Sequence, residues 1–354
     1  MNDKKKIVKH KIVLFLTAGI VPLMVHLFLR YFPPIGHLPD KGKRKEYEKK
    51  TKYYYKGKFH NIEDFKMMTA KASKPDSRCV PDKRIKVSKI THIDRAEKDE
   101  MALYWLGHSS SLLQMGRANI LIDPVFGMRT SPVSFIGPER FSDIPLDVEN
   151  IPDIDVLFIS HDHYDHLDYW TIRKVDDKVR KYIVPIGVDV ILKGWGVDES
   201  KLLTLSWWES IELEDVRYTL IPSRHYTGRN PLHTFATLWG GIYVSNEYHT
   251  FYYTGDTGYC DIFKKVYESF GKTELMLADC GQYDKGWANT HMFPYQTVRA
   301  AQDAKAKCLI PVHWGAYRLS NHPWDEPPRA AKKAAEEMKV NIYVPRIGQR
   351  VSYR

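Results

Sequence analysis

The pattern of apolar and polar positions divides the chain into three parts. An 18-residue, mostly apolar run extends from Ile12 to Leu29 and follows the basic stretch "KKKIVKHK". Residues 33–99 are rich in lysine and show little apolar periodicity. From residue 100 onward, short apolar runs alternate with turn residues. We therefore expect an N-terminal segment at 1–32, a basic extension or linker at 33–99, and a folded domain at 100–354.

The third part predicts many short strands with a few helices between them. Its apolar runs are rich in β-branched and aromatic residues, and several alternate with polar positions, which is typical of strands. These runs are "MALYWLG", "SSLLQMG", "ANILIDP", "IDVLFIS", "KYIVPIG", "VRYTLIPS", "GIYVS", "TFYYTG", "ELMLAD" and "KCLIPVH". Helical spacing occurs at 170–181, 261–270, 294–306 and 329–338. The sequence thus predicts an α/β or α+β domain.

Polar residues recur where these predicted strands end. His161 follows "LFIS", His225 follows "LIPSR", Asp256 follows "YYTG", and His313 follows "LIPV". Loops at strand ends are held by a rigid sheet, and functional side chains are often placed there. We expect these residues to contribute to one site.

The apolar run near the N-terminus predicts a hydrophobic anchor helix. As a helix it would span roughly 27 Å, slightly less than the roughly 30 Å core of a bilayer. The following "RYFPPIGHLPD" has no A-x-A-like cleavage site, which disfavours a signal peptide. We expect a single N-terminal anchor in the cell membrane, with its orientation open because both flanks are positive. Pro22 and His26 also leave an interfacial or buried helix open.

Composition narrows the classes of partner. The chain has 354 residues, of which 43% are hydrophobic, so most of it can fold around a core. Its formal charge of +10 favours anionic partners: nucleic acid, a phospholipid surface or a phosphorylated small molecule. The lysine-rich 33–99 segment is either simply solvated or a contact surface for anionic lipid. The four cysteines are far apart and contain no CxxC pair, so neither a disulfide framework nor a thiolate zinc site is indicated.

The stretch "HDHYDH" at 161–166 predicts a metal site. Imidazole nitrogens and carboxylate oxygens are suitable zinc ligands, and His161 and His163 are spaced to share one ion. Asp165 and His166 follow at a turn and can face a second ion. We expect Asp162 to support a ligating histidine rather than bind metal, and Tyr164 to lie at the mouth of the cleft.

These motifs resemble those of a known family. "SHDHYDHLD", "TGDTGY" and "PVHWG" resemble the HxHxDH signature of the metallo-β-lactamase superfamily and its later aspartate and histidine. "YWLGHSSSLLQ", "LIDPVFGMRTSP", "YYTGDTGYC" and "PVHWGAYRLSNHPWDEPP" are similar to the N-acylphosphatidylethanolamine-hydrolysing phospholipase D family and its bacterial relatives. The resemblance covers about residues 100–350. It implies a four-layer αβ/βα sandwich and two Zn²⁺ ions, with iron or manganese as alternatives.

The resemblance also implies a division of the metal ligands. One ion would be held by His161, His163 and His225, for which His233 is the nearest competitor. The other would be held by Asp165, His166 and His313, with Asp256 bridging the two ions.

The implied reaction is hydrolysis of a phosphodiester by a hydroxide that bridges the metals. Asp165, Asp256 and His291 are the expected catalytic residues, and Tyr164 and His291 the expected substrate contacts. His291 would hydrogen-bond the phosphate or protonate the leaving group, unless Thr290 caps a helix and His291 is merely exposed. Gly107 to Ser111, "GHSSS", is interpreted as a turn between strands without a catalytic role.

The expected substrate is an N-acylphosphatidylethanolamine-like phospholipid or another phosphodiester at an anionic membrane surface. Nucleic acid is not expected, and a homodimer is left open. Cys280, Gln282 and Asp284 stand where the animal phospholipases have a more apolar strand and loop. The loops that shape the acyl-chain groove therefore differ, while the metal chemistry is retained. The alternatives are hydrolysis of a soluble lactone or cyclic phosphodiester, and a non-enzymatic, membrane-anchored binding protein.

Overall fold

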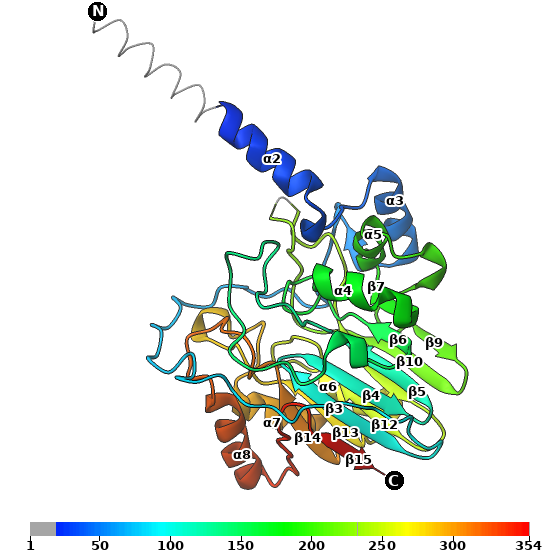
Figure 1. Cartoon of the computed structure of the whole chain (residues 1–354), viewed down its shortest axis with the longest axis vertical. Coiled ribbons are helices and arrows are strands. Elements are labelled where there is room, and N and C mark those ends of the chain that lie inside the picture. The colour runs from blue at the N-terminus through cyan, green and yellow to red at the C-terminus, as the bar shows by residue number, and fades with distance from the viewer. Residues whose placement is uncertain (1–18, 232, 354) are drawn as a thin grey trace, which may run out of the picture.

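The fold is described by a computed structural model that covers residues 19–231 and 233–353. The α-helices are α2 Val21–Tyr31, α3 Lys41–Lys50, α4 Tyr169–Val175, α5 Val188–Gly194, α6 Ile262–Phe270, α7 Pro294–Asp303 and α8 Glu326–Met338. Short 3₁₀ helices are η2 Pro33–Ile35, η3 Val148–Asn150, η4 Asp176–Lys178, η5 Glu199–Lys201 and η6 Lys285–Trp287. The elements follow the chain as coloured in Figure 1.

The strands form one small hairpin and two large sheets. The hairpin pairs β1 Tyr54–Tyr55 with β2 Lys58–Phe59. The other strands are β3 Met101–Gly107, β4 Ser110–Met115, β5 Ala118–Ile122, β6 Ile154–Phe158, β7 Val179–Pro185, β8 Leu202–Leu205, β9 Ser210–Leu213, β10 Val216–Ile221, β11 Gly241–Ser245, β12 Thr250–Tyr253, β13 Leu275–Asp279, β14 Cys308–Val312 and β15 Arg350–Tyr353.

Each large sheet has an antiparallel half and a parallel half. The seven-stranded sheet has the order β15-β3-β4-β5-β6-β7-β8, and its strands run parallel from β5 to β8. The six-stranded sheet has the order β14-β13-β12-β11-β10-β9, and its strands run parallel from β12 to β14. Because the carboxyl ends of parallel strands meet at one edge, residues that follow β5, β6, β12, β13 and β14 are brought toward a common region.

Three large apolar clusters among the described residues hold the four layers together. The largest lies between the sheets, because alternate residues of facing strands point inward, as Leu103 of β3 and Leu277 of β13 do. The outer face of the seven-stranded sheet packs against α4 and α5 through residues such as Ile172 and Leu192. The outer face of the six-stranded sheet packs against α6, α7 and α8. The helices therefore cover both outer faces, as in the four-layer sandwich that the resemblance implied (Figure 1).

Most of the expected strands and helices are present, and the differences have local causes. The helix expected at 170–181 is α4, which ends at Val175; the chain continues through η4 into strand β7 at Val179. Val179, Tyr182, Ile183 and Val184 of this strand are β-branched or aromatic, and the strand pairs with β6 and β8. This tertiary pairing outweighs the weak helical spacing. Five short strands, β1, β2, β8, β9 and β15, and the helices α3 and α5 were not predicted from the apolar pattern.

The predicted anchor helix is not confirmed. Residues 12–18 of the apolar run lie outside the described residues. Within residues 19–231 and 233–353, no helix combines the length and the apolar character needed to cross a bilayer. The remainder of the run forms α2, in which no residue is buried and which extends away from the domain (Figure 1).

The base of α2 is tied to the domain by polar contacts. Asn230 Nδ2 donates to the carbonyl of Leu29 at 2.9 Å. The buried guanidinium of Arg229 donates to the carbonyl of Pro34 through both Nε and Nη2, at 2.9 and 2.6 Å. Trp195 Nε1 donates to the carbonyl of Pro33 at 2.6 Å. These bonds fix the point at which the exposed helix joins the domain.

We predict that Gly281→Ala destabilises the fold and disturbs the region around His313. A Cβ at Gly281 would lie 1.7 Å from the carbonyl oxygen of His313, a clash with backbone that no rotamer can relieve. Overpacking of this kind costs about 1–3 kcal/mol or more, so the melting temperature should fall by several degrees. Gly19→Ala is the matched control, because nothing lies within 4 Å of that position. Equal melting temperatures for the two variants would contradict the prediction.

Candidate metal centre

Three histidine rings converge to form a first ligand cluster. His161 follows β6, His163 lies two residues later, and His225 follows β10. His163 Nδ1 lies 3.0 Å from His161 Nε2 and 3.4 Å from His225 Nε2. In a tetrahedral zinc site with bonds near 2.05 Å, two ligand atoms are about 3.3 Å apart. The spacing of the three nitrogens thus fits a single zinc ion.

A second cluster contains a carboxylate and histidines from both sheets. Asp165 Oδ2 lies 3.4 Å from His166 Nε2 and 3.2 Å from His313 Nε2. His108 Nε2 also lies 3.0 Å from the same oxygen. The donor atoms of all four residues lie within 4.8 Å of one another. The cluster therefore has the donor types and the spacing of a second metal site.

Asp256 lies between the two clusters. Its Oδ2 is 3.1 Å from His166 Nε2 and 3.4 Å from His313 Nε2. The same oxygen is 3.7 Å from His161 Nε2 and 3.8 Å from His225 Nε2. One carboxylate thus faces both sets of ligands, which is the arrangement expected of a bridging residue.

Several buried atoms of this region lack a hydrogen-bond partner. Among the described residues, these include Asp256 Oδ1, His166 Nε2 and His108 Nδ1. An unpaired polar atom costs free energy when it is buried, so native structures seldom leave one without a reason. A pair of divalent cations would satisfy Asp256 Oδ1 and His166 Nε2. The donor set and the unpaired atoms therefore fit a dinuclear metal centre.

The electrostatics of the clusters also favour cations. Burial holds the pKa of His161 and of His225 well below the ordinary value, so these rings are neutral and can act as ligands. Burial alone would lower the pKa of His313, but Asp256 and Asp279 raise it to about 10. In the metal-free protein, a proton on His313 partly offsets the charge of the carboxylates. A bound cation would replace that proton.

Asp123 supports the second cluster from behind. It follows β5 and is fully buried. Its Oδ2 accepts from His166 Nδ1 at 2.8 Å, from the Tyr253 hydroxyl at 2.7 Å and from the Ser160 hydroxyl at 2.6 Å. Hydrogen bonding of Nδ1 to a carboxylate leaves Nε2 of His166 to face Asp165 and Asp256. Asp123 therefore fixes the orientation of a ligand without facing the metal positions itself.

The structure brings together all seven residues expected as ligands, but it places Asp162 and Tyr164 elsewhere. The carboxylate of Asp162 accepts from the backbone N–H groups of Gly228 and Arg229 and from the hydroxyl of Thr237, so it holds a loop rather than a ligating histidine. The Tyr164 hydroxyl donates to the carbonyl of Arg229 at 3.1 Å. Tyr164 thus stabilises the same loop, and it does not line the cavity described below.

Of the other two candidate histidines, His291 lies at the clusters and His233 does not. His291 Nδ1 lies 3.0 Å from Asp279 Oδ2, and its ring packs against those of His225 and His313. Thr290 does not cap a helix: its hydroxyl donates to the carbonyl of Trp287, and α7 begins at Pro294. His233 lies away from the clusters, in a hollow at the base of α2.

Sequence reasoning missed His108, Asp123, Asp279 and Tyr226. The "GHSSS" segment contains the expected turn, which is formed by His108 and Ser109 between β3 and β4. His108 in this turn contacts Asp165. His108 and Asp123 each directly follow a strand, and Asp279 ends one. The strand-end rule that identified the ligands would have identified these three residues had it been applied throughout.

A cavity of about 330 Å³ opens onto both clusters. Its polar residues include His163, Asp165, Asp256, His291 and His313. Apolar and aromatic side chains complete the lining: Met67, Met68, Tyr226, Trp287 and Leu319. The site therefore combines candidate metal ligands with an apolar wall.

Part of that wall comes from the segment before the domain. Asn289 Nδ2 donates to the carbonyl of Lys66, and Thr69 N donates to the carbonyl of Gly286 at 2.8 Å. The backbone N–H of Ser73 donates to the carboxylate of Asp284 at 3.0 Å. These bonds hold the chain around Met67 and Met68 against the loop that carries His291.

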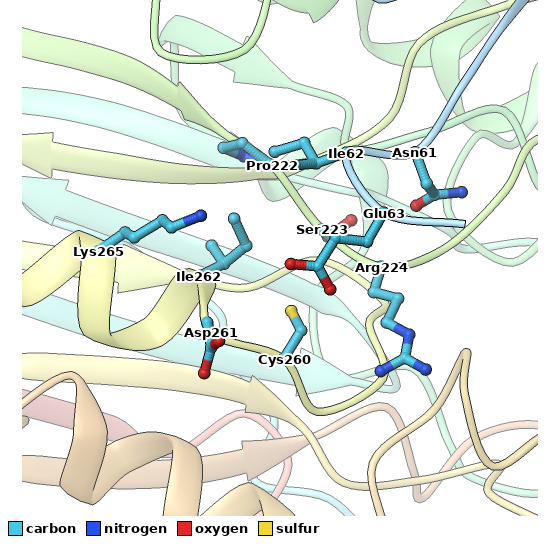
Figure 2. Close-up of a pocket in the computed structure, with 10 residues that line it drawn as sticks. All are labelled: Asn61, Ile62, Glu63, Pro222, Ser223, Arg224, Cys260, Asp261, Ile262 and Lys265. Atoms are coloured by element: carbon cyan, nitrogen blue, oxygen red, sulfur yellow. The ribbon is translucent and has the colours of Figure 1, made fainter. Parts of the chain in front are cut away.

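A smaller pocket of about 30 Å³ lies where the same segment crosses the end of β10 (Figure 2). In Figure 2, Asn61, Ile62 and Glu63 lie over Ser223, Arg224 and Cys260. Asn61 Nδ2 donates to the carbonyl of His225 at 2.9 Å, so this crossing supports a candidate ligand. Burial raises the pKa of the Cys260 thiol, which disfavours the nucleophilic thiolate.

The sequence and the fold of the chain were compared with those of known proteins. The Beta-lactamase superfamily domain matches residues 118–314. The chain is 37% identical over 264 residues to an uncharacterised protein of Mycobacterium tuberculosis, covering 73% of this chain and 71% of that one. It is 32% identical over 292 residues to N-acyl-phosphatidylethanolamine-hydrolyzing phospholipase D 1 of Caenorhabditis elegans, covering 78% and 82%. A metallo hydrolase from the archaeon Ignicoccus hospitalis has a similar fold, with a TM-score of 0.55 and 18% identity over 72% of this chain and 99% of that one.

We predict that Asp123→Asn weakens metal binding at the second cluster. An amide can present its nitrogen to His166 and no longer fixes the ring, and loss of such a partner typically costs about 10- to 100-fold in metal affinity. Titration of the metal-free protein with Zn²⁺ against a chromogenic chelator measures the effect. Asp155→Asn is the control, because Asp155 accepts from Asn119 N on the same sheet but lies outside the clusters. Wild-type affinity in Asp123→Asn would contradict the assignment.

Proposed function

The chain belongs to the metallo-β-lactamase superfamily and is a hydrolase of that fold, and on this premise we propose that it is a membrane-associated, zinc-dependent phosphodiesterase of the phospholipase D type. Its substrates are N-acylphosphatidylethanolamine-like lipids, which it hydrolyses to an N-acylethanolamine and phosphatidic acid. The observation that carries the proposal is the cavity, in which both ligand clusters share one hollow with an apolar wall. A lipid phosphodiester needs both features.

Seven residues would hold the two cations. His161, His163 and His225 would bind one, and Asp165, His166 and His313 the other, with Asp256 between them. When bound, such a pair of cations would lower the pKa of a bound water to about 7 and polarise phosphoryl oxygens. The chain therefore needs no side-chain nucleophile.

Two residues of the cavity are suited to contact the substrate. His291 lies beside the ligand rings of His225 and His313, where an imidazole can hydrogen-bond the phosphate or give a proton to the departing alkoxide. Tyr226 lies against His163 and His225, with ring centroids 4.8 Å apart in each case. A phenol at this position can donate to a phosphoryl oxygen. These residues orient the phosphodiester and the leaving group.

The apolar wall supports a substrate with acyl chains. Met67, Met68 and Leu319 line the cavity next to the polar residues, and Met68 and Leu319 are also exposed at the surface. Methionine is flexible and adapts to irregular apolar ligands. An acyl chain that contacts these side chains would leave the phosphodiester over the metal ligands.

The exposed helix α2 supports association with a membrane. Its large apolar side chains are exposed along the whole helix, with Leu23 at 56% and Met24 at 63%. It is followed by α3, whose sequence "KGKRKEYEKK" carries six basic residues against two acidic ones. An exposed apolar helix beside a basic helix suits the interface of an anionic bilayer. We propose a location at the cell membrane on this basis.

We predict that Asp256→Asn nearly abolishes hydrolysis. The substitution removes the charge of the carboxylate that faces both clusters, so neither cation would be held in place. The holoenzyme and the variant are compared for release of N-acylethanolamine from N-acylphosphatidylethanolamine in mixed micelles, and the variant should match metal-stripped wild type. Asp189→Asn is the matched control, because Asp189 lies outside the site, where it accepts from Gly187 N.

The same assay decides between the alternatives. Metal-dependent release by wild type supports the lipid substrate. Release no greater than that of metal-stripped protein contradicts it, and a panel of soluble lactones and cyclic phosphodiesters then tests the other hydrolase class. Retention of full function by Asp256→Asn would contradict both hydrolase classes and favour a binding protein.

We further predict that Leu23→Glu with Met24→Glu weakens binding to anionic vesicles of phosphatidylcholine and phosphatidylglycerol. Burying a side chain of this size is worth about 1.5–3 kcal/mol, so the loss should be about tenfold or greater in a vesicle sedimentation assay of the full chain. Hydrolysis of a soluble phosphodiester should be unchanged. Tyr248→Glu, in the turn between β11 and β12, is the control for adding a charge at an exposed apolar position. Equal vesicle binding by all three proteins would contradict a membrane role for α2.

A further inference from the structure

Asp279 connects a candidate metal ligand with a candidate substrate contact. It is the last residue of β13 and is 1% exposed. Its Oδ1 lies 3.0 Å from His313 Nδ1, and its Oδ2 lies 3.0 Å from His291 Nδ1. The two histidines come from different loops, one after β14 and the other before α7. A single carboxylate therefore binds both rings, one with each oxygen.

The remaining contacts of Asp279 show that it orients these rings and does not act as a ligand. The backbone N–H of Thr257 donates to Oδ2 at 3.2 Å, and that of Gly281 donates to Oδ1 at 3.4 Å. A carboxylate offers about four acceptor positions, and four donors occupy them here. Although Asp256, Asp279, His291 and His313 have donor atoms within 4.8 Å of one another, Asp279 has no position left for a cation.

The hydrogen bonds fix which nitrogen of each ring is available. Because His313 Nδ1–H points to Asp279, its Nε2 faces Asp165 Oδ2 at 3.2 Å and Asp256 Oδ2 at 3.4 Å. Because His291 Nδ1 is also held by Asp279, its Nε2 is the nitrogen left for the cavity that His291 lines. The two rings are stacked with centroids 5.1 Å apart, so a rotation of one disturbs the other.

We propose that Asp279 is a positioning residue that couples the second metal position to the orientation of His291. Through His313 it sets the affinity of the chain for the second cation, and through His291 it sets the donor that meets the substrate. The proposal rests on the proposed function, since it assumes metal at the second cluster and substrate in the cavity. Asp279 lies outside the seven candidate ligands, and its loss should lower both the affinity for metal and kcat.

Asp279→Ala tests both effects because it removes both acceptors. We expect the affinity for the second Zn²⁺, measured by chelator competition, to fall about 10- to 100-fold. At saturating Zn²⁺, kcat should remain about 100-fold or more below wild type, as in His291→Gln, because the donor is no longer oriented. The double variant, which combines Asp279→Ala with His291→Gln, should then have a kcat no lower than that of His291→Gln alone. The KM of each variant should change little.

Two further variants keep the test decisive. Asp279→Asn retains one acceptor oxygen and serves if Asp279→Ala fails to fold; it should show at least one of the two losses. Asp303→Ala is the matched control, because it truncates a carboxylate on α7 that accepts from the Tyr259 hydroxyl outside the site. Thermal melting of the metal-free proteins checks folding independently of metal.

The outcomes are distinguishable from failure of the proposed function. If wild type binds no metal, the proposed function is wrong. If wild type binds two ions and Asp279→Ala binds them equally tightly, or regains wild-type kcat at saturating Zn²⁺, the role of Asp279 is wrong. If Asp279→Ala and His291→Gln reduce kcat multiplicatively, Asp279 does not act through His291 and the coupling is wrong.

Discussion

The structure depends on one electrostatic constraint: buried carboxylates and imidazoles must share a small volume at one edge of two sheets. Asp256 faces both ligand clusters with Oδ2, while its Oδ1 is buried without a partner. Burial disfavours the charge of this carboxylate, yet the surrounding histidines, His166 foremost, hold its pKa well below the ordinary value. Such a group is stable only when positive charge is close by. Two cations would supply that charge, and the fold arranges the ligands accordingly.

A second set of carboxylates fixes the orientation of the histidine rings. Asp123 holds His166, and Asp279 holds His313 and His291, each from the end of a buried strand. Because β5 and β13 belong to different sheets, the two supports approach the site from opposite sides of the central core. The rings are thus positioned by the most rigid elements of the domain, while the apolar wall comes from the more irregular segment around Met67.

The basic extension at residues 33–99 contributes to the site. Lysine-rich sequence with little apolar periodicity indicated a linker, yet Asn61 supports the backbone of His225 and the chain near Lys66 is bonded to the loop before His291. Its contribution is made by backbone groups, small polar side chains and isolated apolar residues, none of which gives a periodic signal. The apolar run before it was more visible in the sequence, but only α2 and its base are described, and no membrane-spanning helix is present among the described residues.

The sequence by itself predicted an α/β or α+β domain and four of the candidate ligands, because strand alternation and the dense "HDHYDH" motif are local signals. The four-layer sandwich and the roles of His225, Asp256 and His313 as ligands were implied by the resemblance to the superfamily. Tertiary structure alone decided which neighbours serve the ligands. Tyr164, inside the motif, hydrogen-bonds a loop instead, whereas Asp279, 114 positions beyond Asp165, reaches the same cluster through His313. Spacing along the chain specifies which side chains share a strand end. The packing of two sheets over a common core decides which strand ends meet. That packing depends on contacts between distant parts of the chain, so a local sequence pattern does not predict it.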